Sequence, residues 1–212
     1  MWAAIGQQLR RPSGLGGILT GQAMDVLNHR SRQLAIKALC PAADDTILDL
    51  GCGSGQAVCA LATLCPAAQV LGIDHSIVMI NRAARRNRRA IRDGRVQLLR
   101  GDFAALPYRD SSVHKILAVH IVYFADLAVI SEARRVLRPG GRMVLVASEK
   151  AAMEQWAFAR KATHRLFDQQ ELVTFLYDAG FLENEIVCHS PKLNAGVRGI
   201  LAIATKRKDD DQ

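Results

Sequence analysis

Short apolar runs alternate along the chain with longer segments in which apolar residues recur every three or four positions. The short runs are typical of buried strands, and the longer segments are typical of helices that pack one face on a sheet. The pattern predicts helices over 22–39, 55–64, 76–91, 126–137 and 168–179. It predicts strands over 46–50, 69–74, 95–101, 113–119, 141–148, 183–189 and 198–205.

Regular alternation of strands and helices predicts an α/β fold, in which a mostly parallel, doubly wound sheet of seven strands is covered on both faces. The last two strands follow one another without a helix between them, so we expect a hairpin there. Asp168 and Glu171 have capping-box spacing at the start of the last helix, which should end at Gly180. Ser76 is expected to cap the 76–91 helix, whose apolar stripe would be formed by Ile77, Ile80, Ala84 and Ile91.

A glycine-rich segment, Leu-Asp-Leu-Gly-Cys-Gly-Ser-Gly-Gln at residues 48–56, joins the first of these strands to the helix that follows. Such a strand, loop and helix leave backbone amides open to a ligand, and glycine permits positive φ and a close approach. The dinucleotide fingerprint is G-x-G-x-x-G, whereas Gly51, Gly53 and Gly55 alternate and Asp49 stands two residues before the first. The segment predicts a nucleotide-type pocket of another kind.

The alternating glycines resemble the first motif of class I S-adenosylmethionine (AdoMet) methyltransferases. Three further segments follow in the order of that family. Two later apolar runs end in Asp74 and in Asp102, and residues 135–145 resemble the family's turn from the fourth helix into the fifth strand. The resemblance covers residues 46–147, and the four segments in order make it specific.

This resemblance implies a Rossmann-like methyltransferase fold with an antiparallel edge hairpin. It divides the chain into a helical lid segment (1–40), an AdoMet-binding domain (41–206) and a disordered tail (207–212). Asp49 and Gly51 would hold the methionine end of AdoMet, and Asp102 with Phe103 would hold the adenine. The implied cofactor-binding residues are Asp49, Gly51, Cys52, Gly53, Gly55, Asp74, His75, Met79, Asp102, Phe103 and His120.

Asp74 is expected to bind the ribose, because an acid at the end of the second strand can accept hydrogen bonds from both ribose hydroxyls. Replacing Asp74 with alanine should therefore weaken cofactor affinity at least about tenfold, since each charge-assisted bond is worth ~1.5–3 kcal/mol. On the sequence alone, the thermal midpoint of the free protein should barely change.

The methyl acceptor should bind beyond the carboxyl ends of the strands, near the point where strand order reverses. Three segments are expected there: 9–28, 118–124 and 149–167. The first resembles the N-terminal lid of a group of small bacterial methyltransferases. The candidate substrate-binding residues are Met24, Asn28, Tyr123 and Trp156.

His120 and Tyr123 are the candidate catalytic residues. In the small bacterial group the position of His120 is usually asparagine, with Tyr-Phe three and four residues later, so this chain departs from the pattern. An imidazole with a near-neutral pKa could act as general base toward a hydroxyl or amine acceptor. Alternatively, the backbone of His120 holds the methionine end while its ring only packs, and Tyr123 lies in the core or orients that ring.

A net charge of +8 raises the question of a nucleic-acid partner. Between Arg82 and Arg95 there are seven arginines and one acid, Asp93, a net charge of +6. This segment could be a solvated helix face or a patch for RNA. No aromatic residues for base stacking interleave with these arginines, and no Asn-Pro-Pro-Tyr or Asp-Pro-Pro-Tyr follows the fourth strand. We favour the solvated face and expect no nucleic-acid partner.

The chain of 212 residues fits one domain, and no apolar run approaches the ~20 residues of a membrane span. Its five cysteines are scattered without a Cys-x-x-Cys pair, which suits a reducing cytoplasm rather than a disulfide framework or a metal site. The sequence therefore predicts an AdoMet-dependent methyltransferase acting on a small molecule. The alternatives are an RNA methyltransferase that uses the arginine-rich helix and a non-catalytic AdoMet-binding accessory protein.

Overall fold

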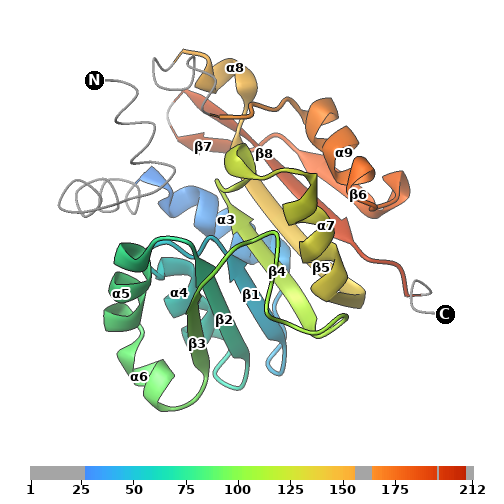
Figure 1. The fold of residues 1–212 in the computed structure, drawn as a ribbon. Coiled ribbons are helices and arrows are strands. Elements are labelled where there is room, and N and C mark those ends of the chain that lie inside the picture. Colours follow the sequence, from blue (N-terminus) through green and yellow to red (C-terminus); the bar gives the residue numbers. More distant parts are fainter. Residues whose placement is uncertain (1–26, 156–163, 195, 209–212) are drawn as a thin grey trace.

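A computed structural model describes residues 27–155, 164–194 and 196–208 (Figure 1). These residues form one mixed sheet flanked by helices, as the alternating pattern predicted. The strands are Thr46–Leu50 (β1), Gln69–Asp74 (β2), Val96–Arg100 (β3), Val113–Val119 (β4), Leu137–Ser148 (β5), Ile186–His189 (β6), Lys192–Asn194 (β7) and Val197–Thr205 (β8).

The strand order is β3-β2-β1-β4-β5-β8-β6, with β7 pairing with β8. Neighbours from β3 to β5 are parallel, whereas β8 is antiparallel to β5 and to β6. This order confirms a doubly wound, mostly parallel sheet with an antiparallel edge. The prediction of seven strands was one short, because the three-residue β7 lies between the two strands of the expected hairpin and is too short to show a periodicity.

In the described residues His29–Leu39 (α3) precedes β1, and the other α-helices lie in the connections between strands. These others are Gln56–Leu64 (α4), Ile77–Arg86 (α5), Arg88–Arg92 (α6), Leu127–Val136 (α7), Lys150–Met153 (α8) and Gln169–Asp178 (α9). The capping box of Asp168 and Glu171 at the start of α9 is confirmed. The single turn of α8 was not predicted, since one turn has no repeat to detect. Of the expected 22–39 helix, residues 22–26 lie outside the described residues.

The predicted 76–91 helix is wrong as one element, because Asn87 divides it into α5 and α6. Asn87 has a non-helical backbone (φ −100°, ψ 14°), and its side-chain Nδ2 donates to the carbonyl of Ala83 at 2.9 Å. Asparagine often competes with helix bonding in this way. The expected apolar stripe is confirmed in part: Ile80 and Ile91 pack against the core, but the buried residues of α5 are Met79 and Ala83, and Ile77 is half exposed. Ser76 caps α5 as predicted, accepting from the Met79 amide.

The fifth strand begins at Leu137 rather than at residue 141, so its predicted start was also wrong. The register with β4 shifts between the pairs Val113–Leu137 and Lys115–Arg142, and Gly140 has a φ of 75°. The irregularity is a bulge, in which extra residues on one strand oppose fewer on the other. The Pro-Gly-Gly turn in the sequence therefore lies inside the strand.

Two apolar layers hold the helices to the sheet. On one face, α3 and α4 contribute Ala35, Leu39, Val58 and Leu61 to a cluster with strand residues such as Ile47. On the other face α7 and α9 bury their own apolar sides (Figure 1). In the described part of the chain, no helix has both the length and the apolar character needed to cross a membrane. The carboxyl ends of β1, β2 and β4 meet at one edge of this scaffold, where the predicted site lies.

Candidate cofactor and acceptor site

The three glycines that follow β1 all have positive φ: 75° at Gly51, 51° at Gly53 and 75° at Gly55. A Cβ on Gly51 would lie 2.1 Å from a side-chain carbon of Ile121, and one on Gly55 would lie 2.7 Å from Ala83. Among the described residues, no heavy atom would lie within 4 Å of a Cβ on Gly53. Two of the glycines are therefore required by packing, whereas the third presents an open face to a ligand.

Asp74 ends β2 and holds this loop. Its Oδ2 accepts from the Gly53 amide at 3.0 Å, and its Oδ1 accepts from the Ser76 amide at 2.8 Å. Burial raises the pKa of the Asp74 carboxyl, although both hydrogen bonds and the neighbouring His75 oppose the shift. Each carboxylate oxygen has a second lone pair, so ribose hydroxyls could still be accepted. Asp74 thus supports the loop in the free protein as well as facing the site.

This double role changes the expectation for the Asp74→Ala variant. The substitution leaves the Gly53 and Ser76 amides without their acceptor, so we expect the free energy of unfolding to fall by about 1–3 kcal/mol. The earlier expectation of an unchanged thermal midpoint did not account for these two bonds. Thermal unfolding without ligand checks this, with Asp44→Ala, an exposed acid, as the control. Equal midpoints for the two variants would contradict it.

Asp49 is 3% exposed, and its Oδ2 has no hydrogen-bond partner in the described structure. Burial and the charge of Asp74 raise the pKa of Asp49 to about 7, and only the charge of Arg32 opposes them. A buried carboxylate oxygen without a partner is unusual in native proteins. It suits a cationic ligand group, and the ammonium of the methionine end of AdoMet is such a group.

The residues predicted at the adenine end are partly brought together. The ring edge of His75 packs against Phe103, with 5.7 Å between ring centroids. Asp102 is exposed beside Phe103, and its Oδ1 accepts from the amide of Ala104 at 3.0 Å. These side chains form an aromatic and acidic edge beyond β2 and β3.

Two other predicted cofactor residues have buried side chains. Met79 is buried on the inner face of α5, and Cys52 is buried with its sulfur beside Gly72. Burial raises the pKa of the Cys52 thiol well above its usual range. The backbone of Cys52, whose amide donates to Ile73 at 3.0 Å, belongs to the loop. Its thiol belongs to the core.

His120 follows β4 and has a φ of 59°, an uncommon conformation for a residue with a side chain. Its Nδ1 lies 3.2 Å from the hydroxyl of Tyr123, and its Nε2 lies 3.0 Å from the hydroxyl of Ser31. Burial lowers the pKa of His120 to about 4. The imidazole is therefore neutral near pH 7, and both of its nitrogens are within hydrogen-bonding distance of hydroxyl groups.

Tyr123 is buried and joins the ends of β4 and β5. Its hydroxyl accepts from the amide of Ser148, and burial raises its pKa to about 12. Its ring stacks with that of His120, 6.0 Å between centroids, and His164 lies 5.9 Å away on another side. The sequence did not single out Ser31 or Ser148. Ser31 lies one helical turn before Ala35 in α3, and the structure buries both.

The predicted substrate residues are only partly described. Met24 and Trp156 lie outside the described residues. Asn28 is half-buried at the start of α3, one turn before Ser31, and its carbonyl accepts from Arg32 at 3.0 Å. It therefore lies on the helix that reaches His120.

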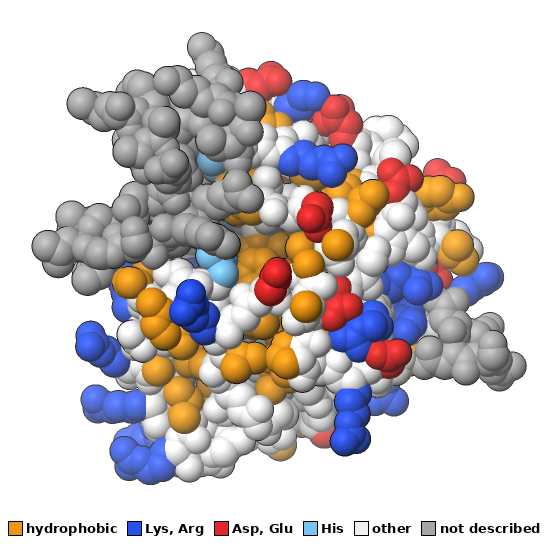
Figure 2. Space-filling model, viewed as in Figure 1, with side chains coloured by type: hydrophobic (Ala, Val, Ile, Leu, Met, Phe, Trp, Pro, Cys, Tyr) orange, Lys and Arg blue, Asp and Glu red, His pale blue; other side chains and the backbone are white. Residues whose placement is uncertain are grey.

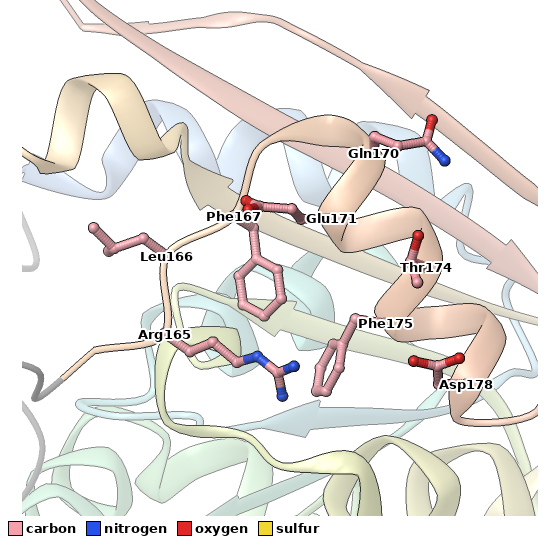
Figure 3. A pocket seen from close by; sticks show the side chains of 8 residues that line it. All are labelled: Arg165, Leu166, Phe167, Gln170, Glu171, Thr174, Phe175 and Asp178. Atoms are coloured by element: carbon pink, nitrogen blue, oxygen red, sulfur yellow. The ribbon is translucent and has the colours of Figure 1, made fainter.

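A separate hollow of about 310 Å³ lies between α9 and the preceding segment (Figure 3). The guanidinium of Arg165 lies over the ring of Phe175, 4.5 Å from its centroid, and 5.5 Å from that of Phe167. Of the residues that line this hollow, Arg165, Leu166 and Phe167 belong to the segment 149–167 that was expected near the acceptor, and those of α9 were not predicted. It is distinct from the glycine loop.

Known proteins match this chain over the same elements. Residues 47–141 match the family described as a methyltransferase domain. The chain is 31% identical over 176 residues to malonyl-[acyl-carrier protein] O-methyltransferase of Dechloromonas aromatica, covering 77% of this chain and 64% of that protein. It is 38% identical over 105 residues to 27-O-demethylrifamycin SV methyltransferase of Amycolatopsis mediterranei, covering 49% of this chain and 38% of that protein. The chain thus spans less than two thirds of the length of either relative.

A solved structure shares the fold. It is geranyl diphosphate C-methyltransferase from Streptomyces coelicolor A3(2) with S-adenosylhomocysteine bound, with a TM-score of 0.72 and 19% identity over 94% of this chain and 87% of that one. The family match begins in β1 and includes the glycine loop and the acids that end the next strands. The sequence of residues 47–141 therefore matches the methyltransferase domain family, and the fold is the one seen in a methyltransferase that binds S-adenosylhomocysteine.

Proposed function

We propose that this chain is an enzyme that methylates a small molecule. The observation that carries the proposal is the preformed glycine loop beside the unpartnered carboxylate oxygen of Asp49, which together fit the backbone and ammonium of AdoMet. When bound, AdoMet would supply a sulfonium methyl group, to which an O, N, S or C nucleophile of the acceptor would bond as S-adenosylhomocysteine leaves with the electron pair of the broken C–S bond. One relative is named for 27-O-demethylrifamycin SV and the other for malonyl-[acyl-carrier protein], and the first of these names supports a small-molecule acceptor.

Five of the predicted cofactor residues have a direct role in this proposal. Asp49 would pair with the ammonium. The open face of Gly53 would let the ligand approach the backbone of the loop. Asp74 would accept from the ribose with the lone pairs that its backbone bonds leave free. Asp102 and Phe103 would hold the adenine from its edge and from its face.

Orientation is the main catalytic contribution that the protein needs to make. The neutral thioether would leave the methyl group without acid assistance, so holding the acceptor in line and excluding water would suffice, an effect worth ~7–11 kcal/mol at best. The hydrogen bonds of His120 with Ser31 and Tyr123 link α3 to the ends of β4 and β5 at this edge. We propose that His120 positions α3 there, rather than taking a proton from the acceptor.

The His120→Asn variant separates these two roles. Asparagine tolerates the left-handed backbone, so the substitution removes the ring without adding backbone strain. We expect turnover at saturating AdoMet to stay within about tenfold of wild type, whereas loss of a general base would cost ~10²–10⁴-fold. Turnover of wild type should also be constant between about pH 6 and 9, because a group with a pKa of about 4 does not titrate there. If the turnover of wild type changed with pH near neutrality, and this dependence disappeared in the variant, the result would favour His120 as the general base.

A direct test incubates the chain with AdoMet and separate acceptors: a phenol, a dicarboxylic acid, an acyl thioester, an amine and total RNA. We expect S-adenosylhomocysteine to form with a small molecule and not with RNA. Binding of RNA that weakens with salt, by roughly one log-log unit per neutralised phosphate, together with methylation of RNA, would favour the RNA methyltransferase. Cofactor binding without turnover on any acceptor would favour the accessory protein.

A further inference from the structure

Two residues at the break between α5 and α6 donate side-chain hydrogen bonds to the glycine loop. Arg86 donates through Nη1 to the backbone carbonyl of Ser54 and, at 2.7 Å, to its hydroxyl. Asn87 donates through Nδ2 to the carbonyl of Gly55 at 3.1 Å, while also bonding Ala83. Two successive loop residues are thus held by two successive residues of another element.

The contact between Asn87 and the loop is tightly packed. Asn87 is 3% exposed, although the residues on both sides of it are exposed arginines. A Cβ on Gly55 would lie 2.7 Å from the Asn87 amide nitrogen, so the loop backbone rests directly on this side chain. The interruption of the helix at Asn87 is what brings the amide to the Gly55 carbonyl.

We propose that Arg86 and Asn87 are positioning residues for AdoMet, acting through the loop and not by touching the cofactor. Gly53, Ser54 and Gly55 form a segment in which two residues are glycine, and glycine has the greatest backbone freedom to lose. If Ser54 and Gly55 are already held in place before the ligand binds, binding does not have to cost this backbone conformational entropy. This proposal rests on the proposed cofactor site.

The proposal also gives one member of the arginine-rich segment a specific role. Lys and Arg side chains gather along the edge that α5 and α6 form (Figure 2). Arg85 is exposed, and within the described structure no hydrogen bond joins it to the loop. It is adjacent to Arg86, carries the same charge and lies on the same helix. Arg85→Gln is therefore a matched control for Arg86→Gln.

The test measures the Kd for S-adenosylhomocysteine by calorimetry in full-length Arg86→Gln, Arg86→Lys, Asn87→Ala and Arg85→Gln. We expect Arg86→Gln and Asn87→Ala each to weaken binding about tenfold, the effect of losing one hydrogen bond to a charged or buried group. Arg86→Lys, which keeps a charged donor, should recover part of the affinity. Arg85→Gln should bind as wild type does.

Hydrogen exchange at the amides of residues 53–55, without ligand and below the unfolding transition, is the second readout. Faster exchange there in Arg86→Gln and Asn87→Ala, with exchange in β1 unchanged, supports the proposal. A purely structural role would lower the thermal midpoint but leave the Kd of the folded protein and the local exchange unchanged, which would overturn it. If wild type itself fails to bind S-adenosylhomocysteine, the proposed function fails, whereas the exchange comparison still reports whether Arg86 and Asn87 hold the loop.

Discussion

Gly53→Ala is expected to abolish tight binding of S-adenosylhomocysteine while the free protein stays folded. The new Cβ meets no atom of residues 27–155, 164–194 or 196–208 within 4 Å, so the cost to this part of the fold is only that of a positive φ, ~1–2 kcal/mol. The same Cβ would occupy the open face that the ligand is proposed to approach. Gly51→Ala should instead destabilise the fold, because its Cβ would overlap Ile121 at 2.1 Å. With overpacking added, we expect it to lose about 2–5 kcal/mol of folding free energy.

Thermal unfolding and calorimetry on both variants check these expectations. Gly94→Ala is the matched control, because Gly94 also has a positive φ, 75°, and open space at its Cβ position, but it lies between α6 and β3. It should lose a similar small amount of stability as Gly53→Ala and keep wild-type affinity. Unchanged affinity in Gly53→Ala would place the ligand elsewhere.

Binding of S-adenosylhomocysteine near pH 7 is expected to release protons from Asp49. With a pKa of about 7, roughly half of the Asp49 carboxyls carry a proton at that pH. The ammonium of the ligand would favour the ionised form, so binding should release about half a proton per site. The affinity should rise about tenfold between pH 6 and 8 for the same reason. Calorimetry in phosphate and in Tris measures the release from the difference in apparent enthalpy.

Asp49→Asn is the control for that measurement, and it should abolish the proton release. The substitution should also change how the stability of the free protein depends on pH, and the direction of this change follows from the raised pKa of Asp49. The folded state binds more protons than the unfolded state between about pH 4 and 7, so the stability of wild type should fall as the pH rises through this range. The full loss is at most about 4 kcal/mol. The asparagine variant should lack this decline. Identical pH profiles for the two proteins would contradict the assignment.

The sheet and the loop could be predicted because their signals are local. An apolar run followed by alternating glycines is contained in about ten residues, and the acids at positions 49, 74 and 102 each end such a run. The same holds for the capping box at Asp168, whose two residues are one turn apart. These features depend on residues that are close together in the sequence, so they could be predicted from the sequence alone.

The features that were missed depend on contacts between distant residues. Ser31 and His120 are 89 positions apart, and nothing in either segment indicates that they meet. Asn87 interrupts a helical pattern and donates to the carbonyl of Gly55, 32 positions earlier. The low pKa of His120 likewise comes from burial by the assembled fold. For this reason the sequence left the role of His120 open.

Calorimetric titration of the full chain with S-adenosylhomocysteine, and in parallel with NAD, tests the central claim most directly. The account predicts saturable heat with one site for S-adenosylhomocysteine and none for NAD, because the alternating glycines and the acids around them were assigned to AdoMet. Heat from NAD with none from S-adenosylhomocysteine would contradict it.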